Sequence, residues 1–338
     1  MNYQEILEKS REGMGPFCKS CKICNGKACR NQIPGPGAKG SGTVAIRNYE
    51  AWQSIYLNMD TLVENKSVDT TCMLFGQTFR LPVFAGPVGA VMTHYGDLYN
   101  DRTYNEVLVK GCKEAGIAAF CGDGKDPSIM KDATAIIKAN EGMGVPTIKP
   151  WAKEVYMEKL QLAKECKAFA VAMDVDAAGL PFLKGAIPPA GRTSKEQLKE
   201  IIDQTPMPFI VKGIMTVKGA LKAKEAGADA IVVSNHGGRV LDHCPATADV
   251  LEEIVQAVGQ DLKILVDGGI RDGSDVFKAL ALGADGVIIA RPFVNMVYGA
   301  KEEGIQVYVD KLQAELTDCM EMCGASTILE ITRDMVRR

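Results

Sequence analysis

The chain has 338 residues, of which 46% are hydrophobic and 24% charged, values typical of a folded protein with a large buried core. Its 39 basic and 42 acidic residues give a formal charge of -3 and are mixed along the chain, so no basic stripe indicates a nucleic-acid partner. The longest nearly apolar run, residues 81–92, is too short to cross a bilayer, and the amino terminus lacks a signal-peptide apolar region. We therefore expect a cytoplasmic protein with no membrane association.

The first 46 residues carry a cysteine cluster followed by a Pro/Gly-rich loop at residues 33–42. Cys18, Cys21, Cys24 and Cys29 are separated by two, two and four residues, and in a reducing cytosol such cysteines stay as thiols or bind metal. The CxxCxxC spacing is typical of four-iron clusters, whereas zinc sites more often use two separated CxxC pairs. Iron-sulfur, zinc and unligated thiols all stay open. An iron-sulfur centre would pass single electrons to a redox partner protein, and zinc would only stabilise the fold.

Eight short apolar runs follow, separated by helical patterns, at residues 81–87, 118–122, 146–150, 168–174, 209–213, 230–235, 263–269 and 286–292. Continuous apolar runs indicate strands buried on both faces, as in parallel sheets covered by helices. No GxGxxG follows the first run, which disfavours a Rossmann fold. We predict an α/β protein in which residues 47–338 form a (β/α)8 TIM barrel after an N-terminal cysteine-containing extension, residues 1–46. Residues 303–324 should form the closing helices, with Cys319 and Cys323 in the core.

Active sites of such barrels lie at the carboxyl ends of the strands. The residues there include Pro87, Val88, Cys121, Lys149, Asp174, Lys212 and Ser234, and then the segments SNHGGRVLD (234–242), DGGIRDGSDVFKALALGADGVIIARPFV (267–294) and VKGI (211–214). Through these three segments the chain resembles the FMN-dependent 2-hydroxy-acid oxidase and dehydrogenase family. The resemblance is clear over about residues 205–330 and weaker over residues 45–100.

Two of these segments predict a phosphate seat. DGGIR follows the seventh strand and ARP the eighth, where barrels usually hold a phosphate, so Arg271 and Arg291 are expected to bind that of FMN. Gly268 and Gly269 allow close approach of the backbone to the ligand. Ala290 stands where the family usually has glycine.

The resemblance also implies the roles of individual side chains. Asp267 would bind the ribityl hydroxyls, and Lys212 and Ser234 would face the flavin. His236 would take a proton from the substrate, Asp174 would stabilise the protonated imidazole, and Arg239 would bind the substrate carboxylate.

The chain departs from the family at several positions. Two tyrosines of the usual substrate pocket, and an arginine after the fourth strand, have no evident counterpart, although Lys184 or Arg192 could replace the arginine. Lys149 replaces the usual glutamine, and Cys121 replaces a serine. His94 and His243 have no context that suggests a function.

We therefore expect an FMN-dependent oxidoreductase that acts on a small 2-hydroxy acid in either direction. The alternatives are an FMN-dependent isomerase of the isopentenyl diphosphate isomerase type, or a flavin and iron-sulfur electron-transfer subunit. By resemblance the chain should form a homo-oligomer.

Overall fold

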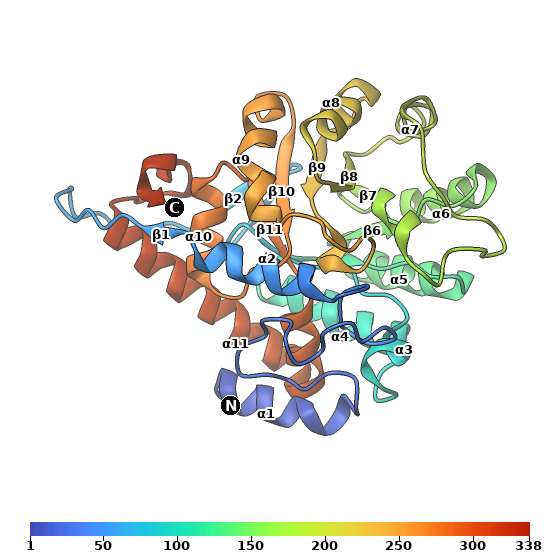
Figure 1. Ribbon diagram of the computed structural model, residues 1–338, viewed down its shortest axis with the longest axis horizontal. Coiled ribbons are helices and arrows are strands. Elements are labelled where there is room, and N and C mark those ends of the chain that lie inside the picture. Colours follow the sequence, from blue (N-terminus) through green and yellow to red (C-terminus); the bar gives the residue numbers. More distant parts are fainter.

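A computed structural model describes residues 1–338 and shows a closed barrel of eight parallel strands surrounded by helices (Figure 1). The strands follow one another around the barrel in chain order, and the last pairs with the first. They are β4 (Val83–Ala85), β5 (Ala118–Cys121), β6 (Gly144–Ile148), β7 (Val171–Asp174), β8 (Phe209–Ile214), β9 (Ala230–Val233), β10 (Lys263–Asp267) and β11 (Gly286–Ile289). Each overlaps one of the apolar runs, so the TIM-barrel prediction is confirmed.

One helix follows each strand on the outside of the barrel. They are α4 (Asp101–Glu114), α5 (Pro127–Ala139), α6 (Lys153–Glu165), α7 (Lys195–Ile202), α8 (Val217–Ala226), α9 (Thr247–Val258), α10 (Gly273–Ala281) and α11 (Arg291–Cys323). Helix α11 is interrupted by non-helical backbone at Ala300 and Lys301, so its second part is the closing helix expected at residues 303–324. Cys319 and Cys323 are buried there, as predicted.

Alternation along the strands separates two cores. Inward-facing residues such as Phe84, Phe120 and Ile210 fill the barrel, and their neighbours pack between the strands and the helices. The hairpin of β2 (Cys72–Leu74) and β3 (Gln77–Phe79) closes the amino-terminal end, where Phe79 meets Phe84 with ring centroids 4.9 Å apart. The opposite end of the barrel, where the strands finish, stays open for a site.

The N-terminal residues pack on the barrel. Helix α1 (Tyr3–Gly13) lies beside α11 (Figure 1), and Tyr3 stacks on Tyr308 with centroids 5.5 Å apart. Helix α2 (Thr43–Gln53) runs through residue 46, and the division into an extension and a barrel domain stays a prediction. The short strands β1 (Tyr56–Leu57) and β12 (Val336–Arg337) pair near the carboxyl terminus, and a five-residue helix, α3 (Val91–Tyr95), follows β4. None of the helices has the length and apolar character needed to cross a membrane.

Candidate active site

The carboxyl ends of the strands surround a cavity of about 540 Å³. Cofactor and substrate sites usually have volumes of roughly 300–1,000 Å³. The predicted site residues that line the cavity are Pro87, Val88, Lys149, Asp174, Lys212, His236, Arg239, Asp267, Gly268, Gly269, Arg271, Ala290 and Arg291. Most of the side chains singled out from the sequence therefore meet in one place.

A network of buried charges forms part of the cavity wall. The Lys212 Nζ atom lies 3.1 Å from Asp174 Oδ1 and 3.6 Å from Asp267 Oδ2, and Lys149 Nζ lies 3.7 Å from Asp174 Oδ2. Burial alone would lower the pKa of Lys212, but the surrounding carboxylates, led by Asp174, raise it above its usual value. Lys212 therefore remains a cation inside the barrel, where an unpaired charge would be costly.

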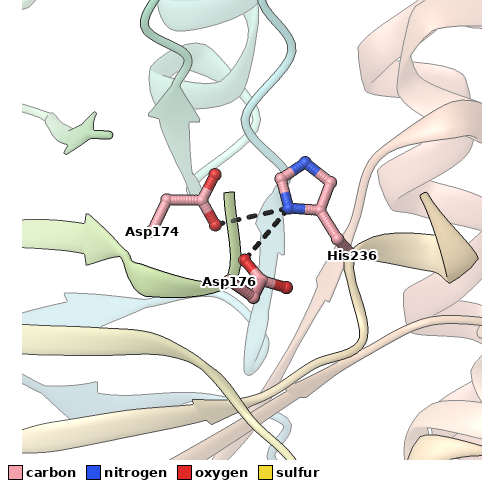
Figure 2. Close-up of side chains that lie close together, drawn as sticks. All are labelled: Asp174, Asp176 and His236. Atoms are coloured by element: carbon pink, nitrogen blue, oxygen red, sulfur yellow. Dashed lines mark hydrogen bonds and ion pairs between the residues drawn. The ribbon is translucent and has the colours of Figure 1, made fainter. Parts of the chain in front are cut away.

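His236 faces two carboxylates through the same ring nitrogen. Its Nδ1 lies 3.1 Å from Asp176 Oδ1 and 3.5 Å from Asp174 Oδ1, and Figure 2 shows the other ring nitrogen, Nε2, on the side away from both. Two acceptors at Nδ1 place the proton of the neutral ring there. Nε2 then carries a lone pair that can accept a proton.

His236, Asp174 and Asp176 influence one another's pKa values. Burial is the largest single influence on the pKa of His236 and acts to lower it, as does Lys212, but Asp174 and Asp176 together outweigh both and raise the pKa. Burial would raise the pKa of Asp174, yet His236 and Lys212 hold it well below its usual range. For Asp176 the effect of burial prevails, and its pKa is raised. Asp174 is thus the fully ionised partner, and Asp176 is the closer one.

The backbone that carries His236 has an unusual conformation. His236, Gly237 and Gly238 have φ angles of 57°, 62° and 83°. A Cβ at Gly238 would lie 2.8 Å from Ala38 Cβ, so the close approach of the N-terminal segment requires glycine there. Asn48 of α2 and Asn235 exchange amide hydrogen bonds of 2.7 and 2.8 Å, which fix the loop just before the histidine.

Arg239 is partly buried and has no carboxylate partner. Its Nη1 donates to the carbonyl oxygens of Gly35 and Gly37 at 2.6 and 3.1 Å, and its Nη2 lies 3.3 Å from His94 Nε2. Burial lowers the pKa of Arg239 to about 10, with a further small decrease from Arg291. A guanidinium that stays charged under these conditions favours an anion in the cavity.

The residues at the β10 and β11 ends fit FMN. The Asp267 Oδ1 atom is buried without a hydrogen-bond donor, as expected of an acceptor for a ligand hydroxyl. Gly269 has φ 89°, and a Cβ there would lie 2.1 Å from the Asn48 carbonyl oxygen. Arg271 and Arg291 line the same region, and no side chain caps the amino terminus of α11, which begins at Arg291. Free backbone N-H groups and two cations suit a phosphate.

Four residues considered from the sequence lie elsewhere. Cys121 is buried between the strands and the helices, because Phe120 points into the barrel and the next residue must point out; Gly122 lines the cavity instead. Ser234 lies behind the wall, where its Oγ donates to Asp267 Oδ2 at 2.9 Å and accepts from Lys212 Nζ at 3.2 Å. The two candidate replacements for the family's arginine, Lys184 and Arg192, are exposed and outside the cavity.

The four N-terminal cysteines do not line the large cavity. Cys18, Cys21, Cys24 and Cys29 line a second, smaller one, together with Pro36, Arg291 and Asn295. Pro36 and Arg291 belong to the walls of both cavities. The cysteine segment is therefore a neighbour of the phosphate seat.

Three residues of the site were missed from the sequence. Asp176, which pairs with His236, stands two positions after Asp174 in the turn η1 (Val175–Gly179), a proximity that could have suggested it. His94 and Tyr95 close the cavity from α3, and the only available signal was their place after the first barrel strand. Tyr95 supplies a phenol to the cavity.

Two arginines at the ends of the last two strands, next to a histidine paired with carboxylates, are features expected of a flavin-binding barrel of the oxidoreductase class. Comparison with known proteins supports this class directly. The model of the FMN-dependent dehydrogenase family matches residues 36–182 and 182–338. The chain belongs to this family and is an FMN-dependent oxidoreductase, so the isomerase alternative is not retained.

The curated relatives include 2-hydroxy-acid oxidases. The peroxisomal (S)-2-hydroxyacid oxidase GLO4 of Arabidopsis thaliana is 32% identical over 86% of this chain and 87% of its own length. The peroxisomal (S)-2-hydroxyacid oxidase GLO3 of the same plant is 52% identical, but over only 39% of this chain and 37% of its own. Among solved structures, a Pediococcus acidilactici protein described as a lactate oxidase has a TM-score of 0.80 and 26% identity, covering 99% of this chain and 93% of its own. A mandelate oxidase structure, with a TM-score of 0.79, 23% identity and coverage of 99% of this chain and 97% of its own, shows the same fold.

Proposed function

We propose that the protein oxidises a small 2-hydroxy acid to the 2-oxo acid, or catalyses the reverse reduction, with FMN in the large cavity. The observation that carries the proposal is that His236, with Nε2 free, and Arg239, without a carboxylate partner, line the same cavity. Oxidation removes the hydroxyl proton and the equivalent of a hydride from C2, that is, two electrons and two protons in all. His236 takes the hydroxyl proton, and FMN, when bound, would supply the acceptor for the hydride equivalent.

His236 is the base in this proposal. Its Nε2 takes the proton of the substrate hydroxyl, and the carboxylates of Asp174 and Asp176 stabilise the imidazolium that results. The raised pKa of His236 strengthens it as a base while leaving it neutral at sufficiently high pH. The reverse reaction uses the same group as the acid.

Arg239 and His94 together bind the substrate carboxylate. The Gly35 amide donates to His94 Nδ1 at 3.1 Å, so the proton of the neutral ring lies on Nε2. Burial lowers the pKa of His94 to about 3, so the ring is neutral. Its Nε2-H and the Arg239 guanidinium are then two donors 3.3 Å apart, and a carboxylate between them satisfies both. His94 in this way takes the place of a pocket tyrosine.

The remaining predicted residues would hold FMN. Arg271, Arg291 and the amino terminus of α11 would bind the phosphate, and Asp267 a ribityl hydroxyl. Lys212 would supply positive charge where the flavin becomes negative on reduction. Pro87, Val88, Lys149, Gly268, Gly269 and Ala290 would form the walls.

The test is anaerobic reduction of the FMN-loaded protein. We expect glycolate, lactate or mandelate to bleach the flavin absorbance, with one 2-oxo acid formed per flavin reduced. The matched control is His236→Gln, which should keep FMN but be reduced at least about 100-fold more slowly. Failure of every such acid, and of every 2-oxo acid as an oxidant of the reduced protein, would refute the substrate assignment. Equal rates in the wild type and His236→Gln would refute the assignment of the base.

The partner, the oligomeric state and the cellular location of the protein stay predictions. A redox partner protein, a homo-oligomer and a cytoplasmic location are expected from the sequence and its resemblance alone. The electron-transfer subunit is disfavoured by the combination of His236, Asp174 and Arg239 at one cavity, since electron transfer alone needs none of them.

A further inference from the structure

The cysteine segment is folded so that its thiols turn inward. Cys18, Cys21, Cys24 and Cys29 are half-buried around one cavity, while the alternating Lys19, Lys22 and Lys27 are exposed. None of the four forms a disulfide. Four thiols from a twelve-residue stretch around a common space form a potential metal site.

The sulfur atoms are not arranged as in a closed tetrahedral zinc site. A zinc ion with Zn-S distances of about 2.3 Å would bring tetrahedral sulfur ligands within about 3.8 Å of one another. The cysteine sulfurs contain no group of three within 4.8 Å. A four-iron cluster binds one thiolate at each iron corner and therefore needs a wider arrangement.

The surroundings of the cavity are basic. Between Cys18 and Arg30 the chain has three lysines and no acidic residue, and Arg291 lines the cavity itself. Arg271 Nε donates to the Cys24 carbonyl oxygen at 2.7 Å, which ties the segment to the loop after β10. A cluster held by four thiolates carries net negative charge, and this environment would stabilise it.

The segment is held to the barrel by individual hydrogen bonds and not by regular secondary structure. Residues 14–42 contain no helix or strand, and their polar contact to α11 is a 3.7 Å approach of Cys18 Sγ to Asn295 Oδ1. Metal binding supplies folding free energy to small irregular segments of this type.

We propose that Cys18, Cys21, Cys24 and Cys29 ligate a [4Fe-4S] cluster beside the flavin cavity. Each thiol loses its proton on binding one iron, and the four irons and four sulfide ions come from cellular cluster assembly. Because Pro36 and Arg291 line both cavities, the cluster would lie next to the phosphate end of the FMN site. Ile23, within the cysteine segment, is exposed. The proposal does not depend on the identity of the organic substrate.

The test is metal and sulfide analysis of the full-length protein purified without oxygen. We expect about four irons and about four acid-labile sulfides per chain, and a paramagnetic cluster signal in electron paramagnetic resonance after reduction with dithionite. One zinc per chain without sulfide, or neither metal, would overturn the proposal.

Variants assign the ligands. The double variant Cys21→Ala, Cys24→Ala should lose the iron and the sulfide, and Cys72→Ala, in the hairpin at the other end of the barrel, should retain both. Iron retained in full by the double variant would overturn the assignment. If the double variant fails to fold or to bind FMN, the wild-type metal and sulfide content still decides the question.

Discussion

The two carboxylates beside His236 should affect catalysis to different extents. Asp176→Asn keeps the size of the side chain and an oxygen acceptor for His236 Nδ1, but removes the negative charge 3.1 Å away. The pKa of His236 should therefore fall, and the acidic limb of the kcat/KM profile should move to lower pH, since the base becomes neutral at lower pH.

The magnitude follows from the ionisation of each carboxyl. A fully ionised neighbour at this distance shifts a pKa by about 1–3 units. Asp176 raises the pKa of His236 less than Asp174 does, so its removal should move the limb by about 1 unit, or about 1.4 kcal/mol. The pKa of Asp174 is held well below its usual range, so Asp174→Asn should move the limb further, by about 2 units.

The assay is kcat/KM for the best 2-hydroxy acid between about pH 5 and pH 9, with both variants at full FMN occupancy. Asp174 also neutralises Lys212, so FMN content and circular dichroism must accompany each profile. A limb that moves to higher pH in Asp176→Asn, or further in Asp176→Asn than in Asp174→Asn, would refute the assigned charges.

Three further changes test other parts of the site. Gly269→Ala should lower the unfolding free energy by about 3 kcal/mol or more, because a Cβ there meets the Asn48 carbonyl. The control is Gly76→Ala: Gly76 has a similar φ of 73° but no neighbour within 4 Å, so the change should cost only about 1 kcal/mol. Thermal or urea unfolding would measure both. Lys212→Met should make the FMN midpoint potential more negative in spectroelectrochemical titration, since the cation near the reduced flavin is lost; an unchanged or more positive potential would contradict its role. Arg239→Lys should raise KM for the 2-hydroxy acid about 10- to 100-fold with unchanged FMN content, because an ammonium cannot bind a carboxylate through two parallel hydrogen bonds. A KM within twofold of wild type would argue against carboxylate binding by Arg239.

The fold could be predicted because its strands are buried on both faces. Each strand then appears as a continuous apolar run, and eight such runs between helical patterns indicate a closed barrel. The same burial hides which residues face inward, since the run no longer alternates between polar and apolar. For that reason the sequence pointed to Cys121 as a cavity residue, whereas the next residue, Gly122, is the one that lines the cavity.

The site could be predicted where its residues lie at or just beyond the carboxyl ends of strands. His236, Asp174 and Lys212 follow from that rule, because the carboxyl ends of parallel strands meet at one face. His94 could not be found in this way, since it lies on a short helix nine residues after β4. Its function depends on the Gly35 amide and Arg239, two groups far away in the sequence.

The charged residues around the cavity form two groups, one in which cations and carboxylates are paired and one in which the arginines have no carboxylate partner. On one side, Lys149, Lys212 and His236 are matched by Asp174, Asp176 and Asp267, so the protein itself balances the groups that handle protons. On the other side, no carboxylate of the protein lies within 4.0 Å of any of three arginines that line the cavity, Arg239, Arg271 and Arg291. Asp275 favours the Arg271 cation from further away, but none of the three arginines has an ion-pair partner, so anions that enter this half would add favourable interactions. A phosphate bound at Arg271 and Arg291 and a carboxylate bound at Arg239 would supply such anions. Ligand binding should therefore stabilise this end of the barrel, and FMN, and then a 2-hydroxy acid, should each raise the unfolding temperature.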